Sequence, residues 1–218
     1  MARGGRLRPL WCDILPIVTQ QPGRRERKKA ATRLALQEAA FQLFGERGYD
    51  ATTVDDISDV ADVSARTFFR YYATKDDVLF GDHIPRLEAV RLLLAERPEG
   101  EPVMTSVEAV LSFLSADLVA NRERVLLQTR VAAEKPHVLG AFRQHHEELL
   151  VLIAEFVGTR LETPDPRGIR ARVIASASMG TLLAASWRWA HSEGTEDLDG
   201  LMAEALDTLR SVVVPEPA

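Results

Sequence analysis

Apolar residues recur every three or four positions along most of the chain, which is the spacing of a helix with one buried face. The first stripe predicts a helix over residues 26–47, and Gly48 directly after it is typical of a helix end. Its apolar positions are Leu34, Leu36, Ala40, Phe41, Leu43 and Phe44. Further helices are predicted over residues 53–61, 64–72, 74–97, 104–121, 122–133, 137–161, 169–192 and 197–213. Alternating strand patterns are scarce, so the sequence predicts an all-α protein.

Side chains that cap helices mark several of these boundaries. Thr53 stands at the start of the second helix with Asp56 three residues on, which is the spacing of a capping box. Ser64 is placed to cap the third helix, and Thr74 with Asp77 repeats the box at the fourth. The first three helices and the start of the fourth therefore form a compact unit over residues 24–78, and residues 79–218 form a second helical domain.

The segment "VSARTFFRYYATKDDV" (63–78) concentrates four aromatic residues in a chain that is only 6% aromatic. On a helix, Phe68 and Tyr72 fall on one side, and Phe69 lies at the boundary. The opposite side carries Arg66, Thr67, Arg70 and Tyr71. A short helix, a tight turn at residues 61–63 and a second short helix with a basic outer face are typical of a helix-turn-helix. Spacing alone leaves open whether this face binds DNA or is simply solvated.

Charge is distributed unevenly along the chain. The net charge is -5, but residues 1–77 hold 13 Lys+Arg against 11 Asp+Glu, whereas residues 78–218 hold 14 against 21. The run "RRERKK" (24–29) is interpreted as a basic tail that could contact a DNA backbone or minor groove. An anionic partner is therefore expected at the N-terminal third of the chain.

Several classes of site lack their sequence signatures. Cys12 is the only cysteine, so neither an intrachain disulfide nor a cysteine-based zinc site is expected, and a reducing cytoplasm fits best. The motifs of phosphate-binding loops, dinucleotide-binding folds and serine hydrolases are missing, so we expect no enzymatic activity and no cofactor. Residues 1–23 only faintly resemble a signal peptide and are predicted to be a disordered extension.

Residues 28–80 closely resemble the N-terminal DNA-binding domain of the TetR family of bacterial transcriptional regulators. The resemblance rests on an F-x-x-x-G-[FY] ending of the first helix, "TTVDDI" in the second, and "VSARTFFRYY" with a downstream "KD" in the third and fourth. By position, it implies DNA contacts from Thr53, Ala65, Arg66, Thr67, Phe69, Arg70, Tyr71 and Lys75. Asp62 replaces the glycine usual in the turn, and aspartate tolerates the left-handed backbone expected there.

For residues 79–218 the resemblance implies a helical ligand-binding and dimerisation domain. The start of this domain is similar to that of regulators associated with the mycofactocin gene cluster, some of which respond to acyl-CoA-type ligands. The helix over 169–192 is rich in small residues, which let helices approach closely. These residues either pack a core within one subunit or, as the family implies, form a four-helix homodimer interface together with the last helix. The implied partners are an operator in double-stranded DNA, a small-molecule effector and a second copy of the chain.

The implied function is that of a repressor released from a palindromic operator by an apolar, acyl-CoA-like effector. A continuous fourth helix from Lys75 through Val90 would act as the lever between the two domains. Arg143 is the candidate anchor for an anionic head group and Trp187 a candidate for the pocket mouth, whereas His145 and His146 are interpreted as a surface pair. Few ionisable groups are expected to face the cavity. The alternative is a helical small-molecule binding protein that no longer reads DNA.

Overall fold

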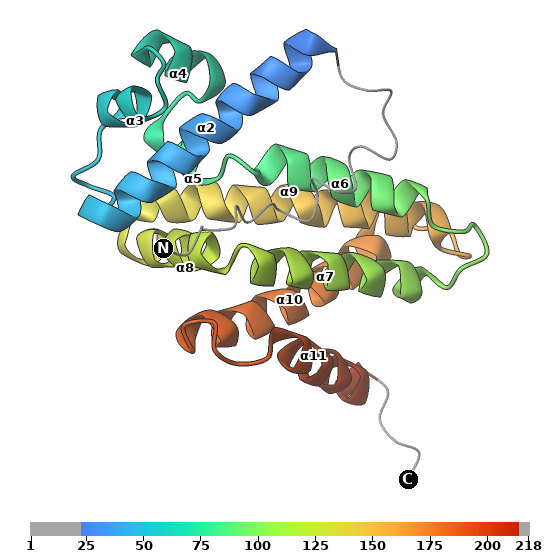
Figure 1. The fold of residues 1–218 in the computed structure, drawn as a ribbon. Helices are drawn as coiled ribbons and strands as arrows, with labels where there is room; N and C mark the ends of the chain where they lie inside the picture. Colours follow the sequence, from blue (N-terminus) through green and yellow to red (C-terminus); the bar gives the residue numbers. More distant parts are fainter. Residues whose placement is uncertain (1–22, 214–218) are drawn as a thin grey trace.

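The computed structural model describes residues 23–213, and all of its regular secondary structure is α-helical (Figure 1). The predicted extension over residues 1–23 lies, apart from Gly23, outside the described residues. The helices are α2 (Arg24–Arg47), α3 (Val54–Val60), α4 (Ala65–Tyr71), α5 (Lys75–Leu79), α6 (His83–Ala95), α7 (Val103–Ala120), α8 (Arg122–Glu134), α9 (Pro136–Arg160), α10 (Ile169–His191) and α11 (Leu198–Val213). The all-α prediction is confirmed.

Helices α2 to α5 form the N-terminal unit, in which the three short helices pack beside the long α2 (Figure 1). The predicted caps are present. Thr53 and Asp56 form a capping box at α3, Ser64 accepts a hydrogen bond from the backbone N–H of Thr67 at α4, and a second box starts α5. These side chains satisfy backbone donors that helices of five to seven residues cannot satisfy internally.

The chain breaks between α5 and α6, where a single continuous helix was predicted. Residues 80–82 form a turn, so no uninterrupted lever runs from Lys75 to Val90. Position 81 suits glycine, since a Cβ atom there would lie 2.6 Å from the Tyr72 hydroxyl oxygen. Glycine is also a poor helix former, so a site that needs its small size favours a turn.

Helices α6 to α11 form the C-terminal unit, with α9, α10 and α7 packed at its centre and α11 along α10 (Figure 1). Its core includes Val107, Leu111, Ile153 and Trp189, all nearly inaccessible to solvent. By length and composition α7 is the one helix of residues 23–213 that could cross a membrane. It instead buries Val107, Leu111 and neighbouring side chains in this core, which is the packing of a central helix in a globular domain.

The two units share a hydrophobic core. The N-terminal cluster around Leu36, Phe44 and Phe68 also contains Val131 and Val138, which come from α8 and α9. Across the same boundary, the Gln128 side-chain amide donates a buried hydrogen bond of 2.7 Å to the carbonyl oxygen of Leu79. The N-terminal unit is therefore packed directly on the α8–α9 corner of the C-terminal unit.

Candidate nucleic-acid interface and ligand cavity

Helix α4 is amphipathic in the sense that the sequence predicts. Phe68 is fully buried and Tyr72 nearly so, and their rings pack with centroids 5.7 Å apart. Tyr72 also donates a hydrogen bond of 3.3 Å to the carbonyl oxygen of Arg33 on α2. On the other side, Arg66 and Arg70 are exposed. Two aromatic anchors thus hold α4 against α2 and turn its arginines outward.

The remaining residues with implied DNA contacts on α4 differ in exposure. Phe69 is 57% exposed, an unusual position for a phenylalanine in a soluble protein. Ala65, Thr67 and Tyr71 are half-buried, and the Arg70 guanidinium lies 5.2 Å from the centre of the Tyr71 ring. The structure therefore brings all six α4 residues to one short helix, with Arg66, Phe69 and Arg70 the most accessible.

Two further features shape this interface. The exposed Thr53 uses its hydroxyl in the α3 capping box, where it donates to Asp56 at 2.6 Å. Asp62 adopts a φ of 54°, the left-handed conformation predicted for the turn. A residue with a Cβ atom is mildly strained there, but aspartate is among those that tolerate it.

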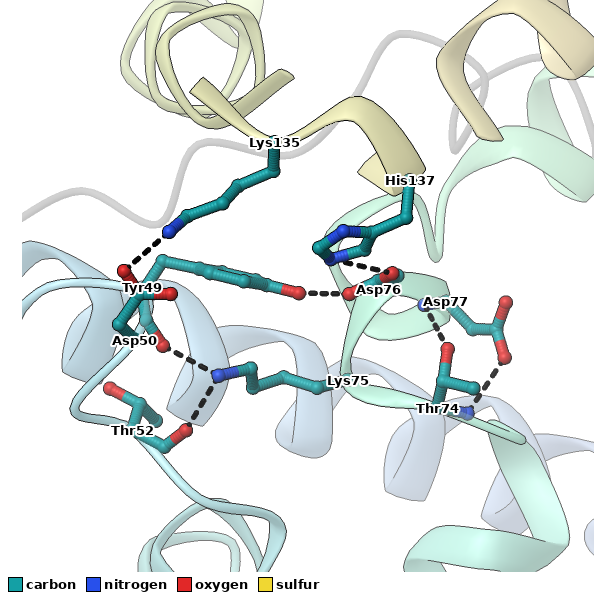
Figure 2. Close-up of polar contacts among 9 residues, drawn as sticks. All are labelled: Tyr49, Asp50, Thr52, Thr74, Lys75, Asp76, Asp77, Lys135 and His137. Carbon is teal, nitrogen blue, oxygen red and sulfur yellow. Dashed lines mark hydrogen bonds and ion pairs between the residues drawn. The ribbon is translucent and has the colours of Figure 1, made fainter. Parts of the chain in front are cut away.

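Lys75 points away from solvent rather than outward. Its ammonium group donates hydrogen bonds to the backbone carbonyl oxygens of Tyr49 (2.7 Å) and Thr52 (2.9 Å), and it lies 4.1 Å from the centre of the Tyr49 ring (Figure 2). Burial lowers the pKa of this lysine. Its ammonium therefore holds the α2–α3 turn in place, and a direct phosphate contact would require it to leave these carbonyls.

The same turn is tied to the C-terminal unit by polar contacts (Figure 2). Lys135, between α8 and α9, forms a 2.6 Å ion pair with Asp50, and that hydrogen bond lowers the pKa of the Asp50 carboxyl. His137 Nε2 lies 3.5 Å from Asp76 on α5, and the Tyr49 hydroxyl donates to the same carboxylate. Burial, together with Asp76, raises the pKa of Tyr49.

The basic run over residues 24–29 is helical. It forms the first turns of α2 rather than the predicted tail, and all six residues are exposed. Five cations gathered at a helix N-terminus oppose the helix dipole, which is itself positive at that end. A nearby anion would relieve this repulsion, so the start of α2 is suited to a phosphate backbone.

A cavity of about 290 Å³ lies within the C-terminal unit. Most of its lining is apolar and comes from α7 to α10, including Leu114, Leu149, Met179 and Leu182. Trp187 belongs to the lining. Arg143 does not, because its side chain is exposed on another face of α9. The anchor proposed from the sequence is therefore outside the cavity.

One wall of the cavity is strongly polar, contrary to the expectation of few ionisable groups. Helix α6 contributes His83 and Arg86, the adjoining turn contributes Asp82, and α9 contributes His145 and His146. The prediction of a surface histidine pair is wrong, because His145 and His146 sit on the inward side of α9 and are only partly accessible. Two adjacent histidines do not indicate which side of a helix they face. The i,i+4 spacing of Asp82 and Arg86, in contrast, could have predicted their ion pair.

Arg86 is already paired within this wall. Its guanidinium donates to Asp82 and to Asp117 at 2.7 Å each, and both carboxylates are buried. These two carboxylates raise the pKa of Arg86 against the opposing effect of burial. The guanidinium is thus neutralised by the protein itself.

The histidines form a stacked pair. The rings of His83 and His145 are nearly parallel with centroids 3.9 Å apart, and His83 Nε2 lies 2.5 Å from a Glu148 oxygen. That hydrogen bond lowers the pKa of Glu148, so this carboxylate stays ionised. Burial, assisted by the nearby His83, lowers the pKa of His145 to about 4, so His145 is neutral near pH 7. Within residues 23–213, no group of three or more His, Cys, Asp or Glu is arranged to hold a metal ion.

Both units of the structure match known protein families. Residues 36–80 match the model of the tetR family of bacterial regulatory proteins, and residues 100–214 match the MftR C-terminal domain. The chain is 29% identical over 197 residues to the HTH-type transcriptional regulator TcmR of Streptomyces glaucescens, covering 87% of each protein. It is 26% identical over 183 residues to the putative mycofactocin biosynthesis transcriptional regulator MftR of Mycobacterium tuberculosis, covering 81% of this chain and 89% of that one.

Solved structures agree with the fold. The TetR-family repressor FadR of Thermus thermophilus, in complex with lauroyl-CoA, is 26% identical with a TM-score of 0.54 and covers 85% of this chain and 97% of its own. The fatty acid degradation regulator FadR of Bacillus halodurans superposes with a TM-score of 0.60 at 18% identity, covering 87% and 96%. The chain belongs to the TetR family of bacterial DNA-binding transcriptional regulators, which are not enzymes, and it carries an MftR-type C-terminal domain.

Proposed function

We propose that this regulator is a cytoplasmic homodimeric repressor that binds a near-palindromic operator and is released from it by a mainly apolar small molecule. The observation that carries the proposal is the pairing of an outward basic face on α4 with a largely apolar cavity in the other unit. The alternative is a helical small-molecule binding protein that no longer reads DNA. The exposed Phe69, Arg66 and Arg70 disfavour it, because a solvated helix face gains nothing from an exposed phenylalanine.

Arg66 and Arg70 are expected to read base edges or phosphates. Replacing either base-reading arginine with alanine should weaken operator binding by about 1–3 kcal/mol and relax specificity at one base-pair position, because arginine pairs bidentately with guanine. Binding measured by fluorescence anisotropy on the operator and on single-base variants tests this. Arg91→Ala, an exposed arginine on α6, is the matched control. Unchanged affinity and sequence preference in both α4 variants would assign the interface elsewhere.

Helix α10 offers a face for dimerisation. Large apolar side chains lie exposed along it at Ile169, Val173, Leu183 and Trp187, on the side that α9 and α11 leave uncovered. The exposed Ser176, Gly180 and Ala184 lie between them and would let a second helix approach closely. A two-fold axis through this face would present two α4 helices to successive major grooves, about 34–36 Å apart or a multiple of that distance.

Val173→Glu is expected to split the dimer. Val173 is 60% exposed in the single chain, and the proposed interface would bury it against apolar side chains. A glutamate there would place a carboxylate in that apolar contact. The dimer dissociation constant should rise at least about tenfold, and operator affinity should fall with it. Analytical ultracentrifugation measures the first effect. Val119→Glu, which adds the same charge to an exposed valine on α7, should leave the dimer intact. A Val173→Glu protein that stays dimeric would rule this face out.

Induction would pass through the contacts between the two units. Because α5 and α6 are separate helices, a ligand that moves the start of α6 would act on Phe80 and on the α8–α9 corner rather than through one rigid rod. Lys135 and His137 join that corner to Asp50 and Asp76 in the DNA-binding unit. By linkage, such an effector binds the DNA-free form more tightly, and the operator weakens effector binding by the same factor.

The experiment is to titrate apolar metabolites, long-chain acyl-CoAs among them, into the protein–operator complex. Long-chain acyl-CoAs deserve inclusion because the related Thermus thermophilus FadR is described in complex with lauroyl-CoA. A ligand that binds the free protein but leaves operator affinity unchanged would contradict release by that ligand. Operator binding that does not weaken with salt would contradict the phosphate contacts expected from α2 and α4.

A further inference from the structure

The polar wall of the cavity holds two buried atoms with no hydrogen-bond partner among the described residues. They are Asp82 Oδ1 and His145 Nδ1, and both residues line the cavity. Asp82 is only 2% exposed, so water outside the protein cannot satisfy its oxygen. Buried polar atoms in folded proteins are nearly always paired, which makes this wall the place where a ligand's polar group would bind.

The charges around this wall disfavour an anion. Asp82, Asp117 and Glu148 place three carboxylates there, against the single guanidinium of Arg86. Arg86 is the only arginine or lysine among the described lining residues, and both of its neighbouring carboxylates already bind it. The three carboxylates therefore outnumber the one guanidinium. A ligand carboxylate or phosphate would therefore meet net repulsion here.

The unpartnered atoms also specify hydrogen-bond direction. An aspartate oxygen can only accept, so its ligand partner must be an N–H or O–H donor. The neutral His145 ring presents Nδ1 either as a donor or as an acceptor, according to its tautomer. A hydroxyl group matches the chemistry of either atom, since it can donate to Asp82 and can donate to or accept from His145. A thioester oxygen accepts only, and would leave Asp82 unpaired.

We propose that the cavity takes an apolar molecule whose polar group is an uncharged or cationic hydrogen-bond donor, such as an alcohol, a phenol or an amine, held by Asp82 and His145. The inference rests on the proposed function in treating the cavity as the effector site. It adds that a free fatty carboxylate is the wrong chemistry for this wall.

Three probes with one hydrocarbon tail test the proposal: decanol, decylamine and decanoate. Each is titrated into the full-length protein by calorimetry, decanol below its solubility limit and the two ionic probes below their micelle concentrations. We expect decanol or decylamine to bind at least about tenfold more tightly than decanoate. Preference for decylamine over decanol would identify the donor as cationic, and the reverse as neutral. Equal binding of all three, tighter binding of decanoate, or no binding of any probe would overturn the proposal.

Two variants separate the polar wall from the apolar lining. Asp82→Asn keeps the shape but removes the charge, so the preference over decanoate should fall by about tenfold or more. Leu118→Ala shortens an apolar lining residue on α7, away from the proposed dimer face, and should weaken all three probes without changing their ratio. Because Asp82 pairs with Arg86, thermal unfolding must first show that Asp82→Asn is folded. If Asp82→Asn does not fold, His145→Phe replaces it, because phenylalanine keeps a stacked ring but removes Nδ1. An unchanged preference of this variant for decanol or decylamine over decanoate would count against the proposal.

Measuring operator binding by fluorescence anisotropy in the same titrations separates two questions: whether a ligand in the cavity releases the operator, and which ligand class the cavity prefers. A donor probe that binds selectively but leaves operator affinity unchanged contradicts induction through the cavity and supports the ligand class. Operator release without selectivity between decanol and decanoate supports induction and overturns the ligand class.

Discussion

Arg86→Leu is expected to lower the free energy of unfolding by about 3–5 kcal/mol, because it removes the guanidinium that two buried carboxylates bind. Asp117 is 0% exposed and Asp82 2% exposed, and both accept hydrogen bonds of 2.7 Å from this one guanidinium. Neither carboxylate can turn to water when the arginine is removed. Chemical denaturation followed by far-UV circular dichroism measures the loss.

Arg210 provides the matched control. It also bridges two carboxylates, Glu108 and Asp207, but on the surface of the molecule. Solvent screens an exposed pair and rehydrates whichever partner remains, so Arg210→Leu should leave the unfolding midpoint nearly unchanged. Equal destabilisation by the two substitutions would show that burial is not what makes the Arg86 pairs matter. Arg86→Lys, which keeps the charge but loses the forked donor geometry, should fall between Arg86→Leu and the wild type.

The N-terminal unit was largely predictable because local chemistry determines its helix ends. Thr53 with Asp56, Ser64, and Thr74 with Asp77 each satisfy backbone groups within three residues, so sequence spacing alone identified them. The inward turn of Phe68 and Tyr72 followed from helical periodicity. These are short-range rules, and they hold wherever the surrounding fold does not oppose them.

The features that were not predictable depend on contacts between distant segments. The need for glycine at position 81 depends on Tyr72, which lies nine residues earlier in the chain, before α5. The direction of Lys75 is determined by carbonyl groups more than twenty residues away. The inward position of His145 and His146 depends on which face of α9 meets α6, which a helix with polar residues on several sides does not disclose.

The cavity was predictable from the sequence only in part. Its apolar lining could be expected from the composition of the helices around it, but its polar wall assembles α6, α7 and α9 from segments separated by more than thirty residues. The candidate anchor Arg143 illustrates the limit. It lies two residues before His145 on α9, and a shift of two residues on a helix turns a side chain by about 200°, to the other side.

Phe68→Ala is expected to lower the free energy of unfolding of the N-terminal unit by about 3–5 kcal/mol and to abolish operator binding, although Phe68 contacts no DNA. The ring is fully buried among Leu36, Ile57 and Tyr72, so its removal leaves a cavity at the centre of this core. Helix α4 has seven residues, too few to remain helical without tertiary contacts. Loss of the anchor therefore disorders the helix that presents Arg66 and Arg70.

The adjacent Phe69 is the natural comparison, because the same substitution one residue along removes an identical side chain from the opposite environment. Phe69 is 57% exposed, so Phe69→Ala creates no internal cavity and should change stability by less than about 0.5 kcal/mol. Its effect on operator affinity, measured by anisotropy, then reports on direct contact alone. If Phe69→Ala leaves both stability and operator affinity unchanged, the exposed ring does not contact DNA. If Phe68→Ala binds the operator normally, α4 is held by more than its aromatic anchors, and the basic face would owe its orientation to the α3–α4 turn and the Ser64 cap instead.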